Sequence, residues 1–147
     1  MDMMIFGFGC LGLIFTGVSV YGAINLKRKP FLFGLYLYSF LPIIAESLFF
    51  VQDKELFHLL IIIIFGVQLV LCSPFTNRYD AFYSDQSKFL ISKMGNALFV
   101  INIGIMLLVV MNMLELHLIF AFYHFVFALC LQFLLYKRKV MKGAQWI

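Results

Sequence analysis

Charged residues are scarce in this chain of 147 residues. They make up 12% of the sequence, whereas hydrophobic residues make up 64%. A soluble domain carries roughly 25% charged and about 45–50% apolar residues. A soluble fold of this length has no interior large enough to hide so much apolar surface. The shortage of charge therefore excludes an ordinary soluble domain and indicates an integral membrane protein whose immediate partners are membrane lipids.

Cysteine is scarce as well, and its spacing is uninformative. Cys10, Cys72 and Cys130 form none of the short paired spacings that mark a metal or redox site. We expect them to act as small packing residues. The chain also lacks an Asn-x-Ser/Thr acceptor, so nothing in it indicates a glycosylated surface.

Motifs that carry catalysis are missing too. The sequence has no Ser, His and Asp pattern, no HExxH and no phosphate loop, so nothing indicates an enzyme. The run from Gly7 to Gly12 matches the letters of a dinucleotide fingerprint. That fingerprint requires a preceding strand and a soluble helix, whereas this run lies inside a long apolar stretch. We therefore reject nucleotide binding.

What the chain does contain is a series of long apolar stretches. A helix rising about 1.5 Å per residue needs roughly 20 apolar residues to cross a bilayer core of about 30 Å. Strands of a membrane barrel would be shorter and would alternate in polarity, which these stretches do not. The sequence predicts an all-α membrane bundle with residues 1–147 as one domain. The five expected spans are Met3–Asn25, Phe31–Val51, Leu56–Cys72, Met94–Leu114 and Leu118–Tyr136.

Charge decides between five spans and four. The third stretch is short, and only Glu115, Leu116 and His117 separate the last two, so residues 94–136 as one span plus a re-entrant piece are an alternative. With five spans, ten of the eleven basic residues fall on one face and only Lys54 on the other, as the positive-inside rule requires. The ten are Lys27, Arg28, Lys29, Arg78, Lys88, Lys93, Lys137, Arg138, Lys139 and Lys142.

The same asymmetry predicts an orientation. Met1 and Asp2 are expected outside, and the chain from Lys137 onward inside. Because the first stretch lacks a positive n-region and a small-residue cleavage site, we expect it to remain as an uncleaved anchor. A bacterial inner membrane or an organelle membrane fits this multi-pass layout. The basic residues are then anchors at an anionic leaflet, and no nucleic acid is expected as a partner.

The longest connection covers residues 73–93 on the positive face. Phe75, Tyr79 and Phe82 recur in it at helical spacing, with charged residues between them. This pattern is typical of an interfacial helix in the headgroup region. An ordinary hydrated loop is the alternative, and the sequence leaves both open.

A stripe of small residues follows the first stretch. Gly12, Thr16, Ser19 and Ala23 recur at steps of four, three and four residues, which places them on one helix face. Small residues let another backbone approach closely in a membrane. The stripe predicts a helix-packing surface toward another helix of this chain or another subunit.

Glu46 is the main candidate for an intramembrane polar or ion site. A carboxylate in hydrocarbon costs several kcal/mol, so Glu46 should be protonated or paired. Ser39 and Pro42 share its helix face, and Pro42 should kink the helix and free the carbonyl of Tyr38. The group predicts an ion or proton site, and a structural hydrogen-bond cluster is the alternative.

The histidines are candidate cofactor ligands. With five spans, His58, His117 and His124 share the outer half of the membrane with Glu46 and Glu115. A neutral imidazole can bind a haem iron, a chlorophyll magnesium or another metal. We expect His117 at the interface and His124 buried. A cofactor-binding role is therefore assigned to His124, with His58 as a second ligand.

Several amides lie within the predicted spans. Amide side chains in membrane helices hydrogen-bond to neighbouring helices, and we expect the same here. They are Gln68, Asn96, Asn102, Asn112 and Gln132.

Three function classes remain open. The first is a non-catalytic accessory subunit of a larger membrane complex, respiratory, photosynthetic or similar, with other membrane subunits as partners. The second is a module binding haem, a pigment or quinone through His124. The third is a small oligomeric ion or solute transporter using Glu46.

Overall fold

The computed structural model describes residues 2–75, 86–111 and 114–143, with side chains for residues 6–75, 86–111 and 118–140. Over these residues the chain forms five α-helices and no strand, which confirms the all-α prediction. The helices are α1 (Asp2–Ile24), α2 (Arg28–Asp53), α3 (Leu56–Cys72), α4 (Gln86–Val110) and α5 (Leu114–Gly143).

Four helices are long and apolar enough to cross a membrane, namely α1, α2, α4 and α5. The remaining helix, α3, is equally apolar but has 17 residues. At about 1.5 Å per residue it is about 25 Å long. The four long helices make a multi-pass membrane protein the natural interpretation of the fold.

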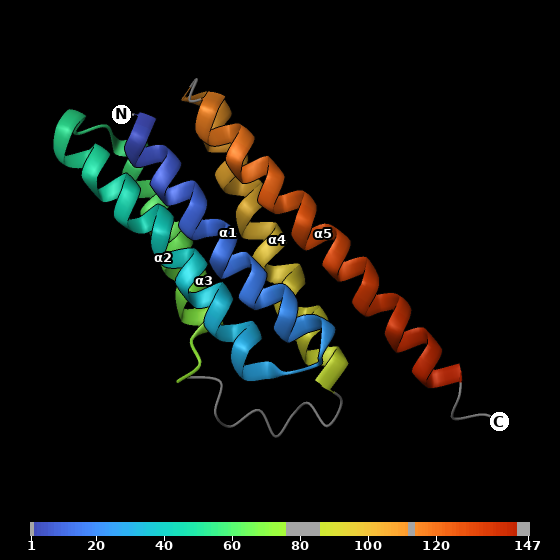
Figure 1. Cartoon of the computed structure of the whole chain (residues 1–147). Coiled ribbons are helices and arrows are strands. Elements are labelled where there is room, and N and C mark those ends of the chain that lie inside the picture. Colours follow the sequence, from blue (N-terminus) through green and yellow to red (C-terminus); the bar gives the residue numbers. More distant parts are fainter. Residues whose placement is uncertain (1, 76–85, 112–113, 144–147) are drawn as a thin grey trace.

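The helices lie side by side and alternate in direction (Figure 1). The helix pairs that pack together are α1 with α2, α2 with α3, α3 with α4, α4 with α5 and α5 with α1, and α2 makes a smaller contact with α4. The α2–α3 turn and the beginning of α5 lie at one end of the bundle (Figure 1). α4 and α5 are separate antiparallel helices, so residues 94–136 do not form one continuous helix.

The fourth helix begins earlier than the sequence indicated. It starts at Gln86, so the hydrated-loop alternative is wrong for residues 86–93. Residues 76–85, which include Tyr79 and Phe82 of the expected interfacial helix, lie outside the described part. The expected span began at Met94, directly after Lys93. Long basic side chains can bury their stems and keep their charge at the surface. Accordingly, Lys93 Nζ donates to the Leu71 carbonyl at 2.7 Å, while Phe89 is fully buried.

The basic residues that the structure describes gather at the end of the bundle opposite the α2–α3 turn (Figure 1). The Arg28 guanidinium lies 4.6 Å from the Phe89 ring centre, and Lys137 Nζ donates to the Ile24 carbonyl at 2.8 Å. Ile24 ends α1, and the carbonyl end of a helix attracts cations. Lys54 lies at the other end, in the α2–α3 turn. The side chains of Arg78 and Lys142 are outside the described residues.

The small-residue stripe of α1 faces its neighbours. All four of its residues, Gly12, Thr16, Ser19 and Ala23, are buried. Ser19 Oγ donates to the Phe31 carbonyl of α2 at 3.2 Å. These small side chains let the α1 and α2 backbones approach closely. Gly12 also leaves room for the side chain of Tyr123, which a Cβ at this position would overlap.

Candidate functional site

His58 bridges two carboxyl groups at the end of the α2–α3 hairpin. Its Nδ1 lies 2.5 Å from Oε2 of Glu46, and its Nε2 lies 3.0 Å from Oδ2 of Asp53. Glu46 and Asp53 are seven residues apart on α2, so they point to nearly the same side of that helix. His58 stands in the first turn of α3 and reaches both.

The tight turn between α2 and α3 positions these groups. Lys54 adopts a left-handed conformation with φ of 59°, and its N–H donates to the Phe50 carbonyl at 2.9 Å. The N–H of Glu55 donates to Oδ1 of Asp53 at 3.1 Å. One oxygen of Asp53 thus holds the turn while the other engages His58. The site is therefore built by the hairpin itself.

The three side chains run from solvent to the interior. The side chain of Asp53 is 46% exposed, whereas those of His58 and Glu46 are 1% and 2% exposed. Phe49 stacks on the imidazole with ring centres 5.9 Å apart and an angle of 30° between the planes. Within this group of three, the imidazole of His58 lies between the exposed carboxyl group of Asp53 and the buried one of Glu46.

This arrangement can hold a proton at each of three positions. A doubly protonated His58 donates to both carboxylates. With the proton on Glu46, that carboxyl donates to Nδ1 while Nε2–H donates to Asp53, and with the proton on Asp53 the roles reverse. Every hydrogen bond persists in each state. A proton can therefore move along the chain of groups without any side chain changing partners.

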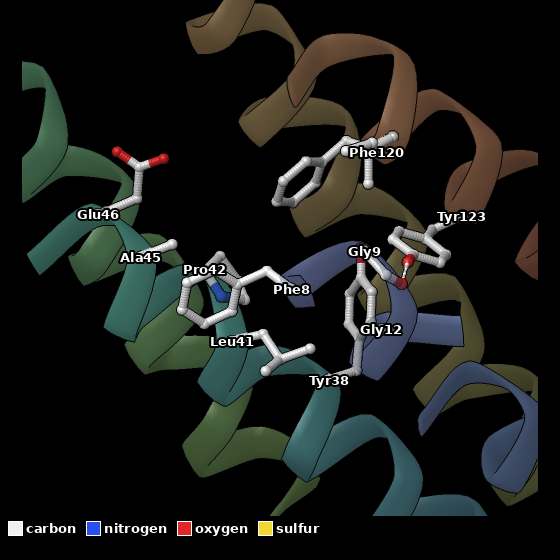
Figure 2. Close-up of a pocket in the computed structure, with 11 residues that line it drawn as sticks. Phe8, Gly9, Gly12, Tyr38, Leu41, Pro42, Ala45, Glu46, Phe120 and Tyr123 are labelled. Atoms are coloured by element: carbon white, nitrogen blue, oxygen red, sulfur yellow. Dashed lines mark hydrogen bonds between the residues drawn. The ribbon is translucent and has the colours of Figure 1, made fainter. Parts of the chain in front are cut away.

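Glu46 also borders a small cavity between α1, α2 and α5. Its volume is about 40 Å³. Figure 2 shows Glu46 at one end of the cavity and the Tyr38 and Tyr123 rings near the other. Tyr123 donates to the Gly9 carbonyl at 2.5 Å, while the Tyr38 hydroxyl has no partner among the described residues. The cavity has room for a few water molecules and is far smaller than the sites that enclose ring-sized ligands.

Ser39 and Pro42, expected to join Glu46, are both buried on its side of α2. Pro42 lines the cavity with Glu46, and α2 continues through it without a break. Ser39 Oγ donates to the Leu35 carbonyl at 2.8 Å, one turn earlier in the same helix. The structure thus brings Pro42 to Glu46 and directs the Ser39 hydroxyl to its own backbone.

The expected cofactor ligands are not brought together. Both ring nitrogens of His58 lie against carboxyl oxygens, so in this arrangement neither is free to bind a metal. The expectation that His124 is buried is wrong, because it is half-buried on α5, and it has no hydrogen bond to any described residue. The side chains of Glu115 and His117 lie outside the described residues. A cofactor role for His124 stays a prediction.

No metal centre is indicated in the part of the chain that the structure describes, where no group of three His, Cys, Asp or Glu residues could hold an ion. For His58, Glu46 and Asp53, the geometry explains why they form no metal-binding group. The two carboxyl groups lie on opposite nitrogens of His58, so the three side chains form a line rather than a shell around one point. The cysteines are free; Cys72 and Cys130 are buried and Cys10 is exposed.

Sequence reasoning missed Asp53 and the tyrosine pair. The spacing of seven residues from Glu46 to Asp53, followed five residues later by His58, was the available signal. Asp53 lies between the predicted spans Phe31–Val51 and Leu56–Cys72, and no role was predicted for it from the sequence. Tyr38 and Tyr123 are 85 residues apart in the sequence, and their ring centres lie 5.2 Å apart. Nothing in the sequence pairs them.

Comparison with known proteins adds no assignment. No protein-family model, curated protein or solved structure matches this chain. The function must therefore be argued from the site.

Proposed function

We propose that this chain is a multi-pass membrane protein that moves protons between an aqueous surface and the buried carboxyl group of Glu46. The observation that carries the proposal is His58, whose two ring nitrogens lie 2.5 Å and 3.0 Å from Glu46 and Asp53. Asp53 is the solvent-exposed end of this relay and Glu46 its interior end. The relay agrees with the third function class, a small ion or solute transporter, with the proton as the coupled ion.

The proposal includes five spans with the N-terminus outside. At about 25 Å, α3 falls roughly 5 Å short of a typical hydrocarbon core, a mismatch that local thinning or tilting accommodates at modest cost. The gathering of the described basic residues at the end opposite the α2–α3 turn supports this orientation. The relay then opens to the outer side.

The relay supplies protons to a carboxyl group that lies within the proposed membrane-spanning part of the chain. An isolated carboxylate inside a membrane costs several kcal/mol, so membrane proteins keep such groups for proton or ion pathways. Glu46 is 2% exposed and has His58 as its hydrogen-bond partner. A proton arriving through Asp53 and His58 neutralises Glu46 without exposing it to water. Glu46 is therefore suited to accept and release protons in step with another event in the membrane.

Infrared difference spectroscopy of the protein in lipid vesicles tests the relay. A protonated carboxyl group absorbs apart from a carboxylate, so a change in bulk pH should produce a reversible carboxyl band. Glu46→Gln should remove this band, and Asp53→Asn should slow its appearance after a pH jump. If no pH-dependent band disappears in Glu46→Gln, the relay does not exist.

Two variants serve as matched controls. Glu55→Gln removes an exposed carboxylate two residues from Asp53, and His124→Gln removes a histidine outside the relay. Both should leave the Glu46 band and its rate unchanged. A loss of the band in His124→Gln would move the site away from His58.

A second candidate is the accessory subunit of a larger membrane complex. The observation that favours it is the exposure of Asn96, Asn102 and Gln132 within α4 and α5. An amide facing lipid without a partner is costly, and contact with another membrane helix removes this cost. Native electrophoresis in mild detergent tests the candidate: we expect a large species, and migration as a lone small species would contradict it.

A further inference from the structure

A line of six residues runs along the outward face of α4. We call it the α4 seam, and it consists of Ser92, Gly95, Phe99, Asn102, Met106 and Val109. These residues recur at alternating steps of three and four, the spacing of a helix that packs lengthwise against another helix. Four of the six are exposed and the first two are half-buried. The exposed fractions of Phe99, Met106 and Val109 are 67%, 69% and 53%.

Asn102 is the residue of the α4 seam that carries an amide side chain. It stands eight residues before the end of α4 at Val110, so it lies about 12 Å inside that end. Its side chain is exposed and has no hydrogen bond to any described residue. An amide at this depth faces hydrocarbon unless another helix covers it. An unpaired amide in hydrocarbon is costly, which favours association with a helix that offers an amide or carbonyl partner.

A second copy of the chain supplies the matching chemistry. An amide has both a donor and an acceptor, so two identical amides can bond to each other. Copies inserted in the same orientation run parallel, and a two-fold axis along the membrane normal places each residue of the seam beside its counterpart. Gly95 leaves open space around its Cα, since a Cβ there would meet no atom within 4 Å. The small residues at one end of the seam therefore permit close approach.

We propose that the α4 seam joins two copies of this chain in the membrane, with Asn102 bonded to Asn102 of the second copy. A polar residue at one seam position fixes the register of a helix pair, because any shift leaves its amide unpaired. The proposal rests on the membrane-spanning part of the proposed function and is independent of the proton relay. It also gives the exposed amide of Asn102 a partner.

Cysteine crosslinking in vesicles tests the geometry of the seam. In a variant with the three native cysteines changed to alanine, Phe99→Cys or Met106→Cys should form disulfide-linked dimers on mild oxidation. Phe125→Cys is the matched control. Phe125 is 59% exposed and lies on α5. It is as many residues after the α4–α5 connection at residue 112 as Phe99 is before it. Dimers from Phe125→Cys but not from the seam variants would overturn the proposal.

Energy transfer between differently labelled copies measures the strength of the pair. Asn102→Leu should raise the dissociation constant of the dimer roughly tenfold, because the hydrogen bonds between the two Asn102 side chains are lost. Asn102→Gln should retain most of the affinity because it keeps the amide. Equal transfer in the wild type and Asn102→Leu would contradict the proposal, and so would a wild type that stays monomeric in vesicles.

Two further measurements distinguish self-association from the proton relay and from binding of a different protein. Asn102→Leu should keep the helical circular dichroism and the Glu46 infrared band of the wild type, so loss of the relay and loss of the dimer are distinguishable. Recovery of a different membrane protein that binds the wild type and is lost in Asn102→Leu would assign the seam to that protein and overturn self-association.

Discussion

At the scale of single residues, His58 determines how the interior tolerates a carboxyl group. Glu46 and His58 are both buried, and each is the hydrogen-bond partner of the other. Removing one member of a buried pair leaves the other desolvated and unpaired, which costs more than the pair contributes when intact. The pair therefore has a testable effect on stability as well as a proposed effect on proton movement.

We predict that His58→Phe lowers the free energy of unfolding by about 2–4 kcal/mol, because Glu46 stays buried without its partner while the ring contact with Phe49 is retained. Unfolding by denaturing detergent in mixed micelles measures the loss. Adding Glu46→Gln should restore part of the stability. His124→Phe is the control, since His124 has no hydrogen bond to a described residue; an equal loss there would refute a special role for the pair.

At the scale of elements, α1 and α2 pack at a distance that only small residues allow. A Cβ on Gly34 would overlap Ser19 and the carbonyl of Phe15 across the interface. Backbone atoms cannot move aside as the end of a flexible side chain can. The hydrogen bond from Ser19 Oγ to the Phe31 carbonyl depends on the same close approach. The contact between these helices holds the helix that carries Glu46 and Asp53.

We predict that Gly34→Ala destabilises the bundle by about 1–3 kcal/mol, the usual cost of adding a methyl group to a full interface. Gly17→Ala is the matched control, because a Cβ on Gly17 meets nothing within 4 Å. The control should be neutral or more stable by up to about 1 kcal/mol, as alanine favours helix. Thermal unfolding in detergent compares the two, and equal stabilities would mean that α1 and α2 do not approach this closely.

At the scale of the whole molecule, the proposed topology places the α2–α3 turn, and with it the exposed end of the relay, on the outer side of the membrane. The described basic residues gather at the opposite end of the bundle (Figure 1), which the positive-inside rule assigns to the inner side. In the proposed topology the short helix α3 crosses the membrane, since its two ends belong to opposite ends of the bundle.

Labelling of single cysteines by a reagent that does not cross membranes tests this orientation. In the variant without native cysteines, we expect Glu55→Cys to react from the outer side of intact cells or right-side-out vesicles. Lys29→Cys and Phe75→Cys should react only after the membrane is opened; all three positions are exposed. Reaction of Glu55→Cys and Phe75→Cys from the same side would show that α3 does not cross.

The sequence by itself determined the all-α class, the approximate helices and the grouping of basic residues, because apolar length and charge placement are local properties of a chain in lipid. It also predicted that Glu46 and His58 lie in the same half of the membrane. Only the tertiary structure decided that His58 bridges Glu46 and Asp53, since this depends on a left-handed turn at Lys54 and on the packing of α3 against α2. Tertiary packing likewise left Asn102 exposed, because the neighbours of a helix determine which of its faces is covered.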